Sequence, residues 1–518
     1  MKRRQALELI GFGTLGTMGA LLSKYTPAQA DSLGISSAEF YNSIQQQSPI
    51  FTLASSLLQE YDYEAQVEGS IPQALQGTLY RNGPGLFDRG NLRKRNLLDG
   101  DGMIQAFRIQ NGKVHYQNRF VRTEKYQKEA AANQFLYDTW SIVASPDVRI
   151  GASPGQAGVT VFSRNGKLYA FDDIGPSWEL NPETLETTGA ANFSLPEQIP
   201  ISFKAHPKID GKTGEWILFA FSPGFSTYFI VTLNPDGSFK HQQAVNMPRR
   251  PYIHDFFVSK RHVIFNLHPV TFDAQQVAQG KSSLIDTFQW QPEQGNLLVV
   301  VNRDSNSEPI QLPIDGAWMW HILNAYETKS EIIADFIGYD NPDHFFGSDP
   351  ILANIMRGQQ SVPKFPGTIR RYIINLKQKT VRQEIIDRGS HELPSINQQF
   401  VGYPYRYGYL LNNTEGAGFL GATAIKRIDM RTGVSQVYDF GDSFYCLEPV
   451  FIPRPGLNYS ANHGHEPGWV LTEVLDRRTK LGALAIFEAE SLAQGPIAIA
   501  RLTHPIPFNF HGYWQESV

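Results

Sequence analysis

Four histidines, each in a different stretch of the chain, are the residues best suited to carry chemistry. They are His206 in FKAHPKID, His254 in YIHDFFVS, His321 in MWHILNAYE and His511 in FNFHGYW. Imidazole is the commonest metal ligand in proteins, and four neutral ligands leave a bound cation with its full positive charge. If the fold brings the four together, they form an all-nitrogen metal site. If it does not, they are ordinary buried or surface histidines.

The other candidates for chemistry are weaker. The chain holds 13 histidines, and the HxH pair His463 and His465 lies in a Gly- and Asn-rich stretch typical of a solvated loop. The single cysteine, Cys446, excludes an intrachain disulfide and a cysteine-rich zinc site, and we interpret it as a small buried hydrophobe. The DGDG run at 99–102 lacks the ligand spacing of a calcium loop and is interpreted as a tight turn.

Short strands are expected to position these residues. From about residue 70 onward, β-branched and aromatic runs alternate with NG, DG, PG and NPDG turns, and no internal repeat is visible. The absence of strand–helix alternation predicts a closed all-β architecture. We expect strands at 167–173, 215–222, 227–239, 262–270, 296–303, 370–376, 405–412, 424–430 and 482–490, and short helices at 37–47, 125–140 and 349–358.

Composition limits the domain organisation and the partners. With 41% hydrophobic residues among 518, the chain can bury a large core. A net charge of −4 without a basic block argues against nucleic acid. No low-complexity linker divides the chain, so we expect one domain over 70–518, preceded by a helical or extended lead-in over 31–70. No obligate protein partner is inferred.

Residues 1–30 have the layout of an export signal, with a basic start, a Gly-rich apolar run and a small-residue AQA end. Arg3 and Arg4 suggest the twin-arginine route, although the residues that follow match that motif loosely. The apolar run is short for a membrane span, which needs about 20 residues, and the alternative is an uncleaved helix resting on a membrane. We therefore expect export to a periplasm or thylakoid lumen, and otherwise a cytoplasmic or membrane-associated protein.

Ordered motifs over most of the chain resemble the carotenoid cleavage oxygenase family. This family includes apocarotenoid and lignostilbene dioxygenases and the retinal-pigment isomerohydrolase. Each fragment alone is weak, but their presence in this order is specific. The fragments are LYRNGPG (79–85), LLDGDGMIQAFRI (97–109), NRFVRTEKY (118–126), LNPETLETTG (180–189), KAHPKID, HDFFV, WHILNAYE (320–327), HELPSIN (391–397), YRYGY (405–409), LEPVFIPRPG (447–456) and FHGYW (510–514).

The resemblance implies a fold and a ligand set. In this family four histidines bind one ferrous iron on the axis of a seven-bladed β-propeller, under a cap of loops and helices. They fall here on His206, His254, His321 and His511. An iron ligand this near the end of the sequence, as His511 is, would let the metal tie down the last strand.

The resemblance also implies carboxylates behind the histidines, since a ligand imidazole needs its other N–H held by an acceptor. Glu392 and Glu448 match two such positions, with His321 and His511 as their expected partners. The third position is usually glutamate, and here Asp173 is expected to face His254, directly or through water. Asp172 is the alternative if the register is off by one residue.

The implied activity is oxidative cleavage of a conjugated C=C bond of a carotenoid or apocarotenoid by Fe(II) and O2, giving two carbonyl products. The main alternative is stilbene cleavage, in which a lysine and a tyrosine hold a phenolate, and Lys125 is the candidate lysine. Retinoid isomerohydrolysis and a non-catalytic binding propeller are the remaining alternatives. Family members contact membranes through apolar patches, for which 134–145 and 351–356 are candidates, with core packing equally expected.

Overall fold

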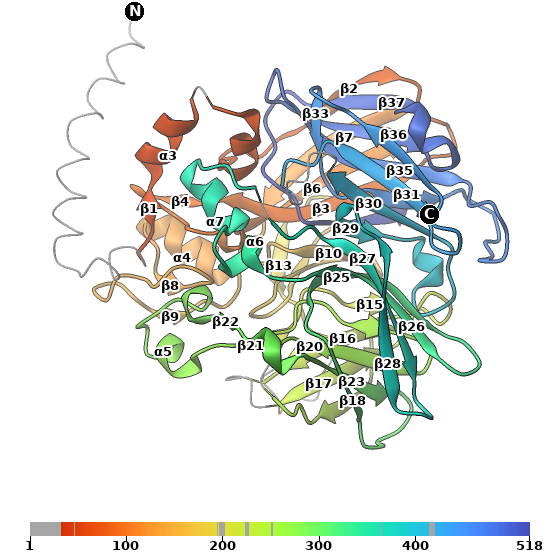
Figure 1. Ribbon diagram of the computed structural model, residues 1–518. Helices are drawn as coiled ribbons and strands as arrows, with labels where there is room; N and C mark the ends of the chain where they lie inside the picture. The colour runs from red at the N-terminus through yellow and green to blue at the C-terminus, as the bar shows by residue number, and fades with distance from the viewer. Residues whose placement is uncertain are drawn as a thin grey trace, which may run out of the picture.

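Antiparallel sheets make up most of the molecule, which confirms the all-β prediction (Figure 1). The structure is a computed structural model that describes residues 33–517 except 46, 194, 196–201, 223–226, 250–251, 363 and 414–419. The predicted export signal at 1–30 therefore lies outside the described residues.

Three sheets follow one another over residues 160–314, and their strands pair in chain order except that β14 and β15 both pair with β16. The first contains β10 (Thr160–Arg164), β11 (Lys167–Phe171), β12 (Trp178–Leu180) and β13 (Thr187–Ala190). The second contains β14 (Ser202–Phe203), β15 (Lys208–Ile209), β16 (Trp216–Phe221), β17 (Tyr228–Leu233) and β18 (Phe239–Val245). The third contains β19 (Phe257–Val258), β20 (His262–Leu267), β23 (Asn296–Asn302) and β24 (Ile310–Ile314).

Two further sheets repeat this arrangement. One contains β25 (Trp318–Glu327), β26 (Ile332–Tyr339), β27 (Thr368–Asn375) and β28 (Thr380–Asp387), and the next contains β29 (Ser390–Ser395), β30 (Tyr407–Asn413), β31 (Ala424–Asp429) and β32 (Ser435–Asp439). Strands β25 and β26 are almost wholly buried, whereas β28 and β32 alternate between intermediate and exposed residues. Each sheet thus runs from an apolar inner edge to a solvated outer edge, as the hydrophobic patterning requires.

A ten-stranded sheet joins the beginning of the described chain to its end. Its strands are β33 (Phe444–Cys446), β34 (Val450–Pro453), β35 (Gly468–Asp476), β36 (Gly482–Glu488), β37 (Ala498–Arg501), β2 (Asp62–Gly69), β7 (Lys113–Phe120), β6 (Asp101–Gln110), β3 (Gly77–Leu86) and β38 (His511–Glu516). Strand β2 is shared, because residues 62–65 pair with β7 and residues 66–69 pair with β37. The sheet therefore begins before the predicted domain boundary at residue 70.

The helices gather on one side of the molecule (Figure 1). They are α3 (Ser37–Ile44), α4 (Glu124–Ala132), α5 (Ala274–Ala278), α6 (Asp343–Phe346) and α7 (Ile351–Asn354). Short 3-10 turns are η1 (Pro49–Ala54), η2 (Leu97–Asp99), η4 (Ile285–Thr287), η5 (Pro292–Gln294), η6 (Ile355–Arg357), η7 (Gln398–Phe400) and η8 (Ala489–Gln494). Small sheets are formed by β1 (Ile35–Ser36) with β5 (Leu92–Arg93) and β4 (Asp88–Arg89), by β8 (Tyr137–Asp138) with β9 (Gly151–Ala152), and by β21 (Val270–Thr271) with β22 (Gln289–Trp290). Within the described residues, every helix is too short or too polar to span a bilayer.

Local chemistry explains where two predicted elements end. Helix α4 starts at the Thr123 cap, whose hydroxyl accepts from the backbone N–H of Tyr126, and it ends at Asn133, whose φ of 50° and ψ of 38° are left-handed. The predicted helix over 125–140 is therefore too long. The predicted strand over 227–239 divides into β17 and β18, because a turn with Gly237 at φ 80° separates them.

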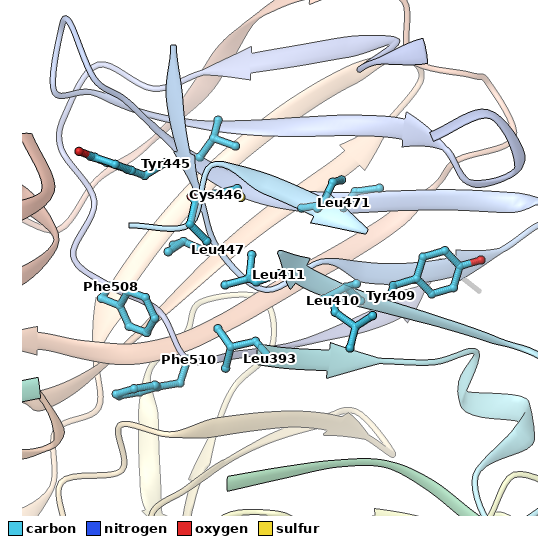
Figure 2. Packing of buried hydrophobic residues seen from close by; sticks show 14 of the residues in the cluster. Leu393, Tyr409, Leu410, Leu411, Tyr445, Cys446, Leu447, Leu471, Phe508 and Phe510 are labelled. Atoms are coloured by element: carbon cyan, nitrogen blue, oxygen red, sulfur yellow. Dashed lines mark hydrogen bonds between the residues drawn. The ribbon is translucent and has the colours of Figure 1, made fainter. Parts of the chain in front are cut away.

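One apolar cluster packs against the backbone beside two candidate site residues. Figure 2 shows Leu393, which follows Glu392, and Phe510, which precedes His511, among buried apolar side chains that include Cys446. Cys446 is 1% exposed, and burial raises the pKa of its thiol, which supports its interpretation as a buried hydrophobe. Packing within this cluster thus fixes the backbone that carries Glu392 and His511.

Candidate metal centre

The structure brings His206, His254, His321 and His511 together. His206 follows β14, His254 precedes β19, His321 lies in β25 and His511 is the first residue of β38, so each comes from a different sheet. One ring nitrogen from each lies within 4.8 Å of the others. All four residues are at most 9% exposed.

The four rings present their Nε2 atoms to a common point. His206 Nε2 lies 2.9 Å from His254 Nε2, which lies 3.3 Å from His321 Nε2, and His321 Nε2 lies 3.1 Å from His511 Nε2. Nitrogen ligands about 2.1 Å from a shared ion and at right angles would lie about 3 Å apart. These spacings therefore fit a divalent metal held by four imidazoles.

Carboxylates hold the opposite nitrogens of three rings. His254 Nδ1 lies 2.7 Å from Asp173 Oδ2, His321 Nδ1 lies 2.5 Å from Glu392 Oε2, and His511 Nδ1 lies 2.8 Å from Glu448 Oε1. A carboxylate acceptor fixes the proton on Nδ1 and leaves the Nε2 lone pair free. Three lone pairs then face one another in a buried space, which is an arrangement that a cation stabilises.

The two glutamates are themselves fixed by further donors. Glu392 Oε1 accepts from the Tyr339 hydroxyl at 3.0 Å. Glu448 Oε2 accepts from Arg81 at 2.7 Å and from the backbone N–H of Gly512 at 2.7 Å. Buried polar groups with every partner in place are rigid, so these contacts orient His321 and His511. Sequence reasoning missed Tyr339 and Arg81.

The third carboxylate, Asp173, reaches His254 directly, so no bridging water is needed. The hydroxyl of Tyr252 donates to the same Oδ2 atom at 2.5 Å, and Lys204 Nζ lies 3.3 Å from Oδ1. Asp172 is not in this position. Its carboxylate accepts from the backbone N–H groups of Gln156 and Asp173.

Burial and these carboxylates set the charge state of the histidines. Burial, reinforced by the neighbouring imidazoles, lowers the pKa of His206 well below its usual value. Burial also lowers the pKa of His254, and it lowers that of His511 to about 4 although Glu448 opposes the shift. Burial lowers the pKa of His321 too, but the Glu392 carboxylate, together with Asp255 and Glu448, leaves this pKa raised. Three of the four rings are therefore neutral ligands over a wide pH range.

An aromatic cluster packs beside the histidines. The ring of Trp320 meets that of His254 edge to face at 4.7 Å, and Tyr252, Trp318 and Phe345 pack around Trp320. All four of these aromatic residues are buried, so the ring of His254 lies against packed apolar core on this side. A separate cavity of about 120 Å³ reaches His206, His321 and His511 and includes the polar residues Lys208 and Asp255.

Lys125, the candidate phenolate-binding lysine, lies in a buried ion cluster under α4. Its Nζ lies 2.6 Å from Asp101 and 2.8 Å from Glu129, and the lysine is fully buried. It does not line the cavity at the histidines. Both oxygens of Glu129 are also occupied, since Oε1 accepts from the backbone N–H groups of Leu136 and Tyr137. A lysine with two carboxylate partners has a structural role here.

The other candidates are placed as follows. His463 and His465 are exposed on a loop. Most apolar side chains of 134–145 and 351–356 are buried, so these segments belong to the core. Exposed large apolar side chains lie elsewhere, at Leu58, Val148, Ile150 and Val362 among others. Membrane contact through the two predicted segments remains a prediction.

Comparison with known proteins places this geometry in context. The model of the family described as retinal pigment epithelial membrane protein matches residues 54–516. The chain is 30% identical over 480 residues to the apocarotenoid-15,15'-oxygenase of Synechocystis sp., covering 89% of this chain and 94% of that protein. It is 28% identical to resveratrol cleavage oxygenase 1 of Aspergillus fumigatus, covering 88% and 92%. The crystal structure of the cobalt-substituted Synechocystis enzyme superposes with a TM-score of 0.80 at 30% identity, covering 91% of this chain and 99% of that chain.

Proposed function

The chain belongs to the carotenoid cleavage oxygenase family, the family of the retinal pigment epithelial membrane protein, and from this we propose that it is a non-haem Fe(II) dioxygenase. Its substrate is a carotenoid or apocarotenoid, and the reaction cleaves one conjugated C=C bond. Both atoms of O2 end in two carbonyl products, so the equation balances without another reductant. The observation that carries this proposal is the convergence of four buried Nε2 atoms on one point.

The donor set fits a ferrous ion. Four neutral imidazoles leave the ion its full charge and leave coordination positions open, as a catalytic metal needs. The cobalt in the solved Synechocystis relative shows that a divalent metal can be accommodated in that protein. When bound, the iron supplies the binding and activation of O2.

The protein's own part is orientation and the exclusion of water. Asp173, Glu392 and Glu448 hold protons on the Nδ1 atoms and keep Nε2 aimed inward. We propose that the aromatic rings beside His254, Trp320 and Tyr252 among them, form the apolar side of the substrate site, since the Trp320 ring packs edge to face against His254. The reaction needs no side-chain nucleophile or general base, and we assign none.

Stilbene cleavage is the second candidate, since a resveratrol cleavage oxygenase and lignostilbene-α,β-dioxygenase isozyme III of Sphingomonas paucimobilis are among the relatives. The burial of Lys125 between Asp101 and Glu129 disfavours it, because that lysine is not available to a phenolate. We therefore place apocarotenoid cleavage first.

We extend the proposal to the architecture. The sheets are proposed to be the blades of a seven-bladed propeller around the metal, with the helices in the cap. Support comes from the order of the site residues along the chain. If the ten-stranded sheet is divided at β2, seven antiparallel units each contribute one residue to the site: Asp173, His206, His254, His321, Glu392, Glu448 and His511.

We also propose that residues 1–30 direct export and are removed. Sequencing the N-terminus of the protein purified from its natural source tests this, and a mature protein that begins at Met1 would contradict it.

The function is tested by purifying the protein, measuring iron content, and incubating it under air with β-apo-8′-carotenal and, separately, with resveratrol. We expect one iron per chain and aldehyde products from the apocarotenoid with consumption of O2. Cleavage of resveratrol alone would favour the second candidate. A folded protein that binds no iron would exclude both.

A further inference from the structure

Of the three histidines that contact a carboxylate, His254 has a different kind of partner from the other two. His321 and His511 are held by glutamates, whereas His254 is held by Asp173, whose side chain is one methylene shorter. The Nδ1-to-oxygen distance is nevertheless 2.7 Å at His254, between the 2.5 and 2.8 Å of the glutamate pairs. Other contacts of Asp173 must therefore compensate for the missing methylene.

Lys204 and Tyr252 are the groups that touch Asp173 from the segments carrying two metal ligands. Lys204 lies two positions before His206, and Tyr252 two positions before His254. Lys204 Nζ donates to the backbone carbonyl of Asp173 at 3.2 Å and lies 3.3 Å from its Oδ1. One ammonium group therefore restrains both the backbone and the carboxylate of this residue.

The Tyr252 hydroxyl completes the arrangement from the other side. It donates to Oδ2 at 2.5 Å, the oxygen that also faces His254 Nδ1. Lys204 Nζ lies 4.8 Å from the centre of the Tyr252 ring, so the two residues also contact each other through a cation–π interaction. Lys204, Tyr252 and Asp173 are 5, 6 and 2% exposed, so water can replace none of these contacts without opening the core.

We propose that Lys204 and Tyr252 are positioning residues for the metal ligand His254. Their contacts orient the short carboxylate of Asp173 so that it reaches Nδ1 of His254. This contact in turn keeps Nε2 of His254 directed at the metal. Neither residue contacts the metal. The inference rests on the proposed metal site, which it deepens by assigning this chain's own solution to a shortened carboxylate.

If Lys204 acts by orienting the carboxylate of Asp173, a substitution at residue 173 should change the effect of a substitution at residue 204. A longer carboxylate should reach His254 without help, so Asp173→Glu should make Lys204 dispensable for metal binding. A lysine that only stabilises the fold, or only holds His206 in place, would not be replaced by a change at residue 173. Rescue by Asp173→Glu therefore separates positioning from both alternatives.

The experiment titrates Co(II) into the metal-free full-length protein and follows the absorption of the bound ion. Lys204→Met, which keeps the length but removes the charge, should weaken Co(II) binding about 10- to 100-fold, the range for a lost partner of a ligand histidine. Tyr252→Phe should weaken it by a smaller factor. The double variant Lys204→Met with Asp173→Glu should return most of the affinity, and Asp173→Glu alone is the reference against which the double variant is compared.

Lys125→Met is the matched control, since it also removes a buried, ion-paired lysine. It should lower the unfolding temperature while leaving Co(II) affinity unchanged. Native affinity in Lys204→Met, or an unrecovered loss in the double variant, would overturn the inference. If Lys204→Met does not fold, Lys204→Gln is judged by the same criteria. A native protein that binds no Co(II) would instead remove the proposed function itself.

Discussion

Two buried clusters of charged and ionisable side chains differ in the partners that their polar groups find within the chain. Under helix α4, Lys125 has Asp101 and Glu129 as partners, and Asp101 also binds Arg89 at 2.7 Å. Each carboxylate there meets a cation supplied by the chain. At the metal centre each carboxylate meets an imidazole N–H group, and Glu448 and Asp173 also pair with Arg81 and Lys204. The opposite nitrogens of those imidazole rings meet only one another.

This difference separates a structural cluster from a functional one. A buried ion pair that is complete within the chain needs nothing from outside, whereas converging lone pairs lack a positive partner. A cation from solution would thus stabilise the metal centre, whereas the cluster under α4 needs none. Buried histidines with carboxylates behind them identify the site better than burial or charge alone.

The largest test of this comparison is His321→Ala. We expect loss of bound iron and a fall of cleavage activity to background, because the site loses a central ligand and Glu392 loses its partner. The protein should remain a folded β structure by circular dichroism. His463→Ala, which removes an exposed loop histidine, is the control and should retain iron and activity. Full iron content in His321→Ala would contradict the assignment.

Lys125→Met tests the structural cluster. Removing one partner of a buried ion pair costs about 3–5 kcal/mol, since Asp101 and Glu129 would stay buried with less compensation. Chemical denaturation should show this loss in the free energy of unfolding, while iron per folded chain stays unchanged. Loss of iron with unchanged stability would reverse the roles given to the two clusters.

Glu392→Gln sharpens the comparison within the metal centre. The amide keeps an oxygen acceptor but loses the charge that supports the His321 N–H, so metal affinity should fall about 10- to 100-fold. Co(II) titration measures this. Glu129→Gln removes a carboxylate of the structural cluster and should leave Co(II) affinity at the native value. Equal losses in the two variants would mean that the effect is not specific to the site.

Glu466 tests whether burial of a carboxylate is unfavourable even where the charge of an arginine, Arg427, acts on it. It is 3% exposed and accepts from the Tyr409 hydroxyl at 2.9 Å, and burial raises its pKa to about 7. A raised folded pKa means that stability is greatest below pH about 4.5 and falls as pH rises through about 7. Glu466→Gln should therefore be more stable than the native protein at pH 8, by on the order of 2 kcal/mol, and equal to it at pH 4.

Unfolding curves at the two pH values decide this last prediction. A stability difference that does not change with pH would show that the charge of Glu466 is not its source.

The candidate site was largely predictable because its residues are polar groups in ordered motifs. Sequence reasoning paired Glu392 with His321, Glu448 with His511 and Asp173 with His254, and the structure has these contacts. It missed Lys204 and Tyr252, although each stands two positions before a candidate ligand. Alternation along an extended segment gives such positions one face, and this was the available signal. The role of Lys125 in binding a phenolate stays a prediction. Its contact with Asp101 joins residues 24 apart, which no local pattern reveals, whereas its contact with Glu129 has the spacing of a helix neighbour.

The all-β class of the fold was predictable, but the pairing between strands far apart in the sequence was not. Strands such as β16 and β23 can be recognised in the sequence as apolar runs. The end of α4, in contrast, depends on one left-handed residue, Asn133. The pairing of β2 with both β7 and β37 joins residues far apart in sequence, and the alternating pattern of 62–69 does not name its partners.

Strand β2 also protects the protein against self-association. Without it, β7 and β37 would each present an unpaired row of backbone N–H and C=O groups, the kind of edge that recruits strands from other molecules. One eight-residue strand covers both edges at once. Detachment of β2 would therefore expose two unpaired sheet edges in a single step. We expect the solubility of the protein to depend on this strand, which holds no part of the metal centre.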